Sequence, residues 1–378
     1  MGRVAKDGAG GAVSAAVDGL DVVRTDADAE GNPLPPLIVL DKLEAFLDEH
    51  GLGSGPLRVE RIGVRGGSNF SFLLERDEGK YVLRRPPRPP LPPSAHDMVR
   101  EARLQLALAK QGIRVPPIVA VGEDESVLGV PFYVMDFLDG HVIVSSLPPA
   151  LEDDPDGRHR LGLDLIDTLA QIHSVDVNEP DLAQFIRPGS YQERQVRRWT
   201  QLWEINQTRE LPVPELARRM AVDIPEPLPL AVVHGDYRIG NVMVGGEPVR
   251  IIAVLDWEMG AIGDPRADVG YVMATYLEPG GPPTPLGASP PTAEPGFPSK
   301  AELVARYEER TKRRLERLHW FEALAFWKSS VFCEAIYGRY IRGELGEAPQ
   351  AARFETAVPH MVEAGLAAIE RDEAERRA

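Results

Sequence analysis

The stretch Val232–Asn241 reads VVHGDYRIGN, and Val254–Glu258 reads VLDWE a short distance later. In each stretch an apolar run typical of a buried strand leads into a polar segment. Asp236 precedes Asn241 by five residues, and Asp256 follows the second apolar run. Asp and Asn are common turn residues, so neither would mean much alone. Three polar positions combined with two strand-like runs form a more specific pattern.

A β-hairpin is predicted to bring the two polar segments together. Asn241–Val244 and Val249–Leu255 have the apolar character of paired strands, and a glycine turn lies between them. This hairpin places Asn241 and Asp256 at the same end. Amide and carboxylate oxygens are ligands that suit Mg²⁺. The sequence therefore predicts a magnesium site formed by Asn241 and Asp256.

The same residues match the requirements of kinase-type phosphoryl transfer. Such enzymes use a carboxylate that faces the acceptor hydroxyl, a metal-binding amide five residues later, and a second carboxylate that holds Mg²⁺ on the phosphates. Asp236 is predicted to be the catalytic carboxylate, with Asn241 and Asp256 as the metal ligands. His234 is expected to support the loop structurally. Glu258 is a further position that would support the metal through water.

The surrounding letters differ from those of protein kinases. His-Gly-Asp at 234–236 replaces His-Arg-Asp, and Asp-Trp-Glu at 256–258 replaces Asp-Phe-Gly. This combination resembles the aminoglycoside phosphotransferase and choline-kinase-like family of small-molecule kinases. The resemblance runs from about Arg58 to the last helices. It implies an α+β, bilobal protein-kinase-like fold, with a small antiparallel β N-lobe, a larger mainly helical C-lobe, and ATP and Mg²⁺ in the cleft. It also implies that Asp268 braces the catalytic loop.

Patterning along the chain predicts three parts. Residues 1–35 are rich in Gly, Ala and Asp without periodicity, and we expect a loose tail. Residues 36–139 hold five strand-like segments with one helix between the third and fourth, which predicts the nucleotide-binding N-lobe. Residues 140–378 are mainly helical around the catalytic hairpin, which predicts the C-lobe. The predicted strands span residues 58–62, 70–75, 80–84, 118–122 and 131–137.

A glycine-rich segment, Gly63–Phe70, lies between the first two predicted strands. Glycines let backbone N–H groups approach phosphates, although a glycine-rich hairpin turn has the same letters. Its position upstream of the other motifs favours nucleotide contact. Residues 133–140 resemble the hinge of the family, where the base is recognised through backbone groups. The predicted nucleotide-binding positions in these two segments are Gly66, Gly67, Ser68, Asn69, Met135 and Phe137.

The third strand should supply a cation that reaches the phosphates and pairs with a carboxylate on the next helix. The family usually has a lysine here, whereas this chain reads YVLRR at 81–85. Alternate residues of a strand face opposite sides. We therefore expect Arg84 to point inward, near Glu101, and Arg85 to point toward solvent. Lys80 and Arg85 remain alternatives for the phosphate-binding cation.

The composition limits the partners. Hydrophobic residues make up 43% and charged residues 26% of the chain, which is ordinary for a globular protein. The net charge of −16 disfavours nucleic acid and anionic membranes as partners. No apolar run approaches the ~18 residues that span a bilayer. The start lacks a basic, apolar signal pattern, and the chain has one cysteine, Cys333, so a cytoplasmic location is expected.

The sequence leaves open the hydroxyl acceptor, the choice between ATP and GTP, and the oligomeric state. Aminoglycosides are polycations, so the negative net charge agrees with an aminoglycoside-type acceptor, the leading candidate. However, residues 83–87 and 94–98 also resemble the kinase-like domains fused to some acyl-CoA dehydrogenases, which are associated with hydroxyacyl substrates. A non-catalytic kinase-like nucleotide-binding protein would be expected to lack Asp236, Asn241 or Asp256. A metal-dependent hydrolase would need more converging His and Asp ligands.

Overall fold

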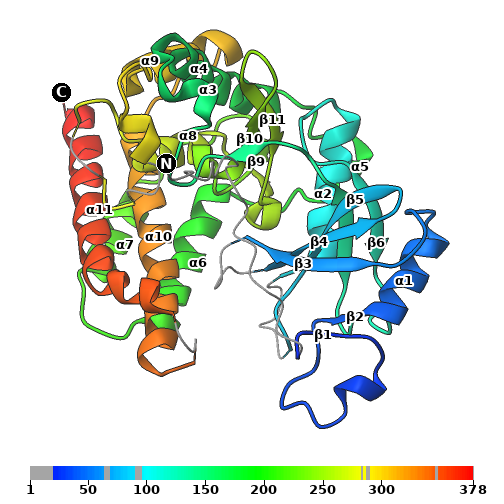
Figure 1. Cartoon of the computed structure of the whole chain (residues 1–378). Helices are drawn as coiled ribbons and strands as arrows, with labels where there is room; N and C mark the ends of the chain where they lie inside the picture. Colours follow the sequence, from blue (N-terminus) through cyan, green and yellow to red (C-terminus); the bar gives the residue numbers. More distant parts are fainter. Residues whose placement is uncertain are drawn as a thin grey trace, which may run out of the picture. The chain divides into compact units, whose positions relative to one another are not determined.

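The computed structural model describes residues 20–63, 69–89, 96–281, 284–286, 290–344 and 348–377. The chain forms two compact units (Figure 1). Unit 1 comprises the chain up to Lys110 together with Val115–His141, and unit 2 comprises Gln111–Arg114 together with the chain from Val142 onward. Unit 1 is built around a β-sheet and unit 2 is mainly helical, so the class is α+β.

A five-stranded antiparallel sheet, with strand order β3-β4-β5-β7-β6, is the centre of unit 1. Each of the five predicted strands is confirmed, with ends within one residue of the prediction. Helix α2 (Met98–Lys110) separates the third of these strands from the fourth along the chain, as predicted. The strands are β3 (Arg58–Ile62), β4 (Phe70–Arg76), β5 (Gly79–Arg85), β6 (Ile118–Gly122) and β7 (Phe132–Asp136).

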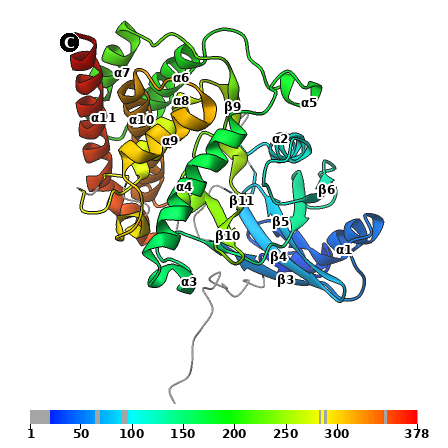
Figure 2. The ribbon, with the colours of Figure 1, turned by 90° about the horizontal axis from the view of Figure 1, so that it is seen from above.

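Two helices cover opposite faces of this sheet (Figure 2). Helix α1 (Leu40–Glu49) buries Leu47 in a cluster with Leu83 of β5. Helix α2 buries Ala102 against Tyr133 of β7. Since side chains alternate along each strand, odd and even positions of β5 face different helices. This alternation decides which arginine of β5 lies next to α2.

The segment before α1 is more ordered than the sequence predicts. Strand β1 (Val22–Val23) pairs in parallel with β2 (Ile38–Val39), and a 3₁₀ turn, η1 (Ala27–Ala29), lies between them. Val23 is buried. The expectation of a loose tail to residue 35 is therefore wrong from Leu20 onward, because Val23 and its neighbours bury apolar surface. Residues 1–19 lie outside the described residues.

Unit 2 is a helical assembly around a core rich in tryptophan, including Trp199, Trp203, Trp320 and Trp327. Helices α10 and α11 lie side by side in both views (Figures 1 and 2). In the part of the chain that the structure describes, no helix has the length and apolarity needed to cross a bilayer. The helices are α3 (Pro149–Glu152), α4 (Pro155–Ile172), α5 (Pro180–Ala183), α6 (Tyr191–Asn206), α7 (Val213–Val222), α8 (Arg266–Thr275), α9 (Lys300–Thr311), α10 (Leu318–Ile341) and α11 (Phe354–Arg377), with 3₁₀ turns η4 (Pro290–Ala293) and η5 (Pro349–Arg353).

Two small sheets of unit 2 position the polar loops of the sequence motif. The predicted hairpin is confirmed as β10 (Val242–Gly245) paired with β11 (Arg250–Val254), and β8 (His141–Val142) is the third strand of that sheet. The other sheet pairs β9 (Ala231–Val233) with β12 (Ala261–Gly263). The 234–241 loop follows β9, and Asp256 follows β11.

Candidate active site

The loop after β9 presents Asp236 in a fixed orientation. The Asn241 side-chain Nδ2 donates to the backbone oxygen of Asp236 and to its carboxylate Oδ2, both at 2.8 Å. The Asp236 backbone N–H donates to His234 Nδ1 at 3.2 Å. The Asp236 side chain is 26% exposed. The carboxylate is therefore held by the protein, while part of the side chain stays exposed.

Gly235 is a position where only glycine fits. Its φ is +87°, in the left-handed region that side chains disfavour. A Cβ there would lie 2.8 Å from Met259 Cβ and 2.9 Å from the Met259 carbonyl oxygen. The glycine of the His-Gly-Asp motif thus permits a sharp turn directly before Asp236.

Asp268 of α8 binds the backbone of this turn, in the way that the family resemblance implies. Its Oδ2 accepts from the His234 N–H at 2.7 Å, and its Oδ1 accepts from the Gly235 N–H at 2.8 Å. Asp268 is fully buried. Burial opposes its ionisation, but the hydrogen bond and charge of His173 and the loop amides hold the pKa of Asp268 below its usual value.

His173, which the sequence analysis did not single out, extends this network. Its Nε2 lies 3.2 Å from Asp268 Oδ2, and its Nδ1 lies 2.7 Å from the Tyr307 hydroxyl. Burial lowers the pKa of His173, although the neighbouring Asp268 carboxylate opposes that shift. A buried chain from α9 through α4 to α8 therefore supports the 234–236 turn.

The hairpin brings Asn241 and Asp256 to one end, as predicted. Val242 pairs with Val254, and the Leu255 N–H donates to the Asn241 backbone oxygen at 2.8 Å. Because Asn241 uses its Nδ2 as a donor to Asp236, its Oδ1 is the atom left to serve as a ligand. An amide oxygen and a carboxylate form a donor set that suits Mg²⁺, which usually completes its shell with water and phosphate oxygens. Asp256 itself has a φ of +65°.

His234 and the residues after Asp256 pack together beneath this end of the hairpin. His234 is buried, its Nε2 lies 2.8 Å from the Leu255 carbonyl oxygen, and its ring is 4.6 Å from that of Trp257. Trp257 is buried in the 3₁₀ turn η3 (Trp257–Met259), and its indole N–H donates to Val254. Glu258, in the same turn, is half-buried.

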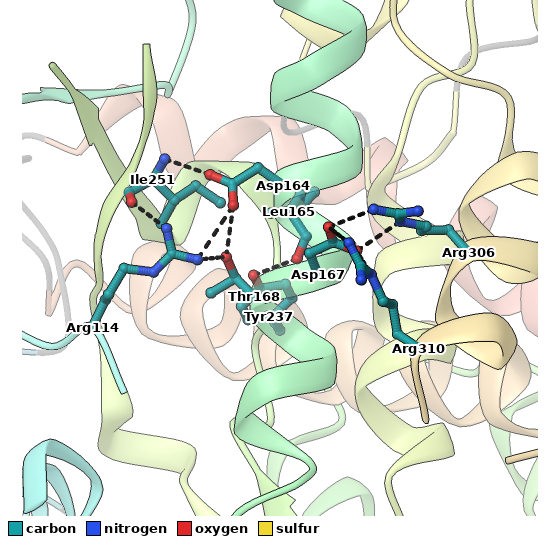
Figure 3. Close-up of polar contacts among 9 residues, drawn as sticks. All are labelled: Arg114, Asp164, Leu165, Asp167, Thr168, Tyr237, Ile251, Arg306 and Arg310. Carbon is teal, nitrogen blue, oxygen red and sulfur yellow. Dashed lines mark hydrogen bonds and ion pairs between the residues drawn. The ribbon is translucent and has the colours of Figure 1, made fainter. Parts of the chain in front are cut away.

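Helix α4 supports the other end of the hairpin through Arg114 (Figure 3). The Arg114 guanidinium donates to the Ile251 carbonyl at 2.6 Å and to Asp164 at 3.3 Å, and Asp164 accepts from the Ile251 N–H at 2.7 Å. The Tyr237 hydroxyl donates to the Leu165 carbonyl at 2.7 Å. Both β11 and the loop that carries Asp236 are therefore tied to the same helix. On the opposite side of α4, Asp167 points away toward α9.

The cation of β5 in unit 1 lies beside the predicted carboxylate. Arg84 Nε is 3.3 Å from Glu101 Oε1, and the Tyr133 hydroxyl donates to the same oxygen at 3.0 Å. Glu101 is 1% exposed and the Arg84 side chain 15%. Arg84 therefore faces α2, as the alternation along β5 predicts.

The prediction that Arg85 points toward solvent is wrong. Arg85 is 1% exposed and donates to the backbone carbonyls of Leu37 and Pro86. Burial lowers its pKa to about 10. The physical reason is that the segment before α1 covers this end of the sheet, a non-local contact that the strand pattern does not reveal. Lys80, at the start of the strand, pairs with Glu75 at 2.6 Å.

Among the other predicted nucleotide-binding positions, the structure describes Asn69, Met135 and Phe137. Gly66, Gly67 and Ser68 lie outside the described residues. Asn69 Oδ1 is 2.8 Å from His96 Nδ1. Met135 is half-buried in β7, and the Phe137 N–H donates to the Lys80 carbonyl at 3.2 Å. A nucleotide contact by Phe137 would therefore use its carbonyl or its side chain.

Comparison with known proteins identifies the family. The sequence profile of the "Phosphotransferase enzyme family" matches residues 60–303. This chain belongs to the phosphotransferase enzyme family. A solved structure from Ralstonia eutropha, provisionally described as an aminoglycoside phosphotransferase, is 31% identical, with a TM-score of 0.72 over 88% of this chain and 98% of that one. The α+β, kinase-like fold is thus confirmed.

Two further proteins resemble this chain over most of its length. Acyl-CoA dehydrogenase family member 10 from Mus musculus is 31% identical to this chain. The aligned region covers 83% of this chain but only 29% of the length of that protein. The predicted resemblance to kinase-like domains of acyl-CoA dehydrogenase proteins is therefore confirmed. The structure of a spectinomycin phosphotransferase in complex with ADP and spectinomycin shares the fold, with a TM-score of 0.56 at 13% identity, over 87% of this chain and 98% of that one.

Proposed function

We propose that this protein is an ATP- and Mg²⁺-dependent phosphotransferase that moves the γ-phosphate of ATP to a hydroxyl group of a small molecule. The observation that carries the proposal is the arrangement of Asp236, held by Asn241 and partly exposed, with Asp256 at the same end of the hairpin. This is the set of groups that phosphoryl transfer requires. The ADP complex of the spectinomycin phosphotransferase supports the choice of nucleotide.

Each group has a role in the proposed reaction. The acceptor hydroxyl oxygen forms a bond to the γ-phosphorus while the bond from that phosphorus to the β-phosphate oxygen breaks, and ADP leaves. Asp236 orients the hydroxyl and accepts its proton. Asn241 and Asp256 would hold Mg²⁺, which supplies positive charge to the phosphates when bound. Arg84, oriented by Glu101, would bind phosphate oxygens.

Removing Asp256 tests the proposed metal site. Asp256→Ala is expected to abolish most of the Mg²⁺-dependent gain in ATP affinity, because the only carboxylate of the proposed donor pair is lost. Calorimetric titration of ATP with and without MgCl₂ measures this gain. Asp153→Ala, at an exposed position, is the control. Equal Mg²⁺-dependent affinities in wild type and Asp256→Ala would remove Asp256 from the metal site.

The two arginines of β5 provide a matched pair for the phosphate contact. Arg84→Ala is expected to lower kcat/KM for ATP by about 10- to 100-fold, since a charge-assisted hydrogen bond contributes about 1.5–3 kcal/mol. Arg85→Met should act mainly on the melting temperature, because its guanidinium serves buried backbone carbonyls. Steady-state kinetics and thermal melts separate the two. Normal kinetics in Arg84→Ala would leave Lys80 as the remaining cation of this strand.

Among the acceptors that the sequence leaves open, the charges around Asp236 favour one that carries an anionic group. Arg238 Nε lies 3.7 Å from Asp236 Oδ1. Burial lowers the pKa of Lys328 in α10. The nearby Asp236 carboxylate opposes this shift in pKa, and the Arg198 cation adds to it. Arg238, Lys328 and Arg198 are therefore available to bind an anionic group of the acceptor, beside the carboxylates of Asp236, Asp268 and Glu258. A hydroxyacyl compound with a carboxylate or phosphate group would be attracted.

A direct screen decides between these acceptors. The purified protein is incubated with ATP and Mg²⁺ and either aminoglycosides or hydroxy acids and their coenzyme A thioesters. Mass spectrometry then detects acceptors that have gained one phosphoryl group. Phosphorylation of the anionic hydroxyl compounds alone is the expected result. Phosphorylation of aminoglycosides alone would refute the charge argument but not the phosphotransferase, whereas no product together with no ATP binding would refute both.

A further inference from the structure

We propose that Lys328 is a positioning residue for the catalytic loop. From helix α10 its ammonium holds the Gly235 carbonyl and thereby fixes the direction of the Asp236 side chain. The inference rests on the proposed function, because it assigns Asp236 the central role. Lys328 belongs to none of the motifs by which the sequence points to phosphoryl transfer. It acts through the loop, without a required contact to the acceptor.

The sequence around Lys328 is unusual for a lysine. It is the only charged residue in the run Ala323–Cys333, which reads ALAFWKSSVFC. Its neighbours Phe326 and Trp327 are buried in the core of unit 2. Burying an ammonium in such a run costs free energy unless it donates hydrogen bonds to polar groups. A partner for Lys328 is therefore required, and the structure provides one at the candidate active site.

Several groups in the described part of unit 2 surround the Lys328 ammonium and explain its position. Its Nζ donates to the Gly235 carbonyl. It also lies 5.1 Å from the centre of the Tyr271 ring, within range of a cation–π contact. Burial lowers the pKa of Lys328, while the charges of Asp236, Asp268 and Glu258 oppose that shift.

The contact fixes one particular peptide plane. The plane that joins Gly235 to Asp236 contains the Gly235 carbonyl and the Asp236 N–H, and it is rigid. Lys328 holds this plane at its oxygen, and His234 Nδ1 holds it at its nitrogen. The preceding plane is held by Asp268 through the Gly235 N–H. Gly235 has no side chain to restrict its dihedral angles, so these contacts determine how Asp236 leaves the turn.

The first test replaces Lys328 by methionine, which keeps the length of the side chain and removes the donor. Lys328→Met is expected to raise amide hydrogen exchange in peptides covering 233–238 several-fold. The variant should also lower kcat by about 100-fold, because small misplacements in an active site cost that much. Here kcat is measured as ADP formed from ATP in the presence of Mg²⁺, with water or an acceptor found in the screen. The KM for ATP should change less than about twofold. Lys110→Met, on the exposed end of α2, is the control.

Lys328→Gln separates positioning from charge. Glutamine keeps an N–H donor for the Gly235 carbonyl but carries no charge. The expected result is that this variant retains the protection of residues 233–238 and recovers most of kcat relative to Lys328→Met. Loss of kcat in Lys328→Gln with the loop still protected would overturn positioning, because the charge itself would then be required. Increased exchange throughout α10 and α11, with a lower melting temperature, would also overturn it, because the role would then be structural.

An Asp236→Asn variant in the same series distinguishes failure of this inference from failure of the proposed function. If Asp236→Asn keeps wild-type turnover, the role proposed for Asp236 is wrong and another group accepts the proton. If Asp236→Asn is inactive while Lys328→Met keeps both wild-type turnover and loop protection, only the role of Lys328 is wrong. Loss of both turnover and loop protection in Lys328→Met, with unchanged ATP affinity, supports the proposal.

Discussion

Asp236→Asn is expected to reduce phosphoryl transfer by about 10²- to 10⁴-fold, the usual contribution of a positioned general base. Asparagine has nearly the same shape and still offers an oxygen to Asn241 Nδ2, so the hydrogen bond at 2.8 Å and the loop should persist. The amide cannot accept the proton of the acceptor hydroxyl. Quantitative mass spectrometry of the phosphorylated acceptor measures the loss.

The same variant should bind nucleotide normally. Asp236 is proposed to face the acceptor, and the proposed metal ligands are Asn241 and Asp256, so the ADP affinity should stay within about twofold of wild type. The control is Asp256→Ala, in which Mg²⁺-dependent affinity is expected to fall. Parallel loss of nucleotide affinity in Asp236→Asn would mean that Asp236 is a metal ligand. Full turnover would mean that another group accepts the proton.

The parts of the fold that the sequence predicts well are those set by local patterns. The five predicted strands of unit 1 and the β10–β11 hairpin are short apolar or alternating segments, and their ends agree with the structure to within one residue. The position of Arg84 beside Glu101 follows from alternation along one strand. In both cases the deciding information lies within a few residues.

The predictions that failed depend on distant contacts. Arg85 follows the same alternation as Arg84, but whether its face meets solvent depends on Leu37, 48 residues earlier. The order of Val22–Val23 likewise depends on pairing with Ile38–Val39. A single sequence does not show which distant segment covers a strand.

The supporting residues of the catalytic loop were missed for a related reason. His173 lies at the end of an ordinary amphipathic helix, and its link to Asp268 joins positions 95 residues apart. No local signal points to it. Lys328 did have a signal, as a lone cation within an apolar helical run. Such a residue needs a polar partner, and the structure, not the sequence, identifies it as the Gly235 carbonyl.

Asp268→Ala is expected to cause the largest loss of stability among the variants considered, about 3–5 kcal/mol. The change leaves the His234 N–H, the Gly235 N–H and His173 without their shared acceptor in a fully buried site. Unpaired buried donors cost far more than lost surface contacts. Thermal and denaturant unfolding measure the loss, and phosphoryl transfer should fall with it because the turn before Asp236 is released.

Asp167→Ala is the matched control, because Asp167 also accepts hydrogen bonds from more than one residue but is partly exposed, on the side of α4 that faces α9 (Figure 3). Its ion pairs with Arg306 and Arg310 are partly exposed, so the loss should be about 1 kcal/mol or less. The contrast isolates burial as the cause. If Asp268→Ala unfolds no more easily than Asp167→Ala but loses phosphoryl transfer, then Asp268 orients the loop without stabilising the fold, and the 234–236 turn must be held by its other contacts.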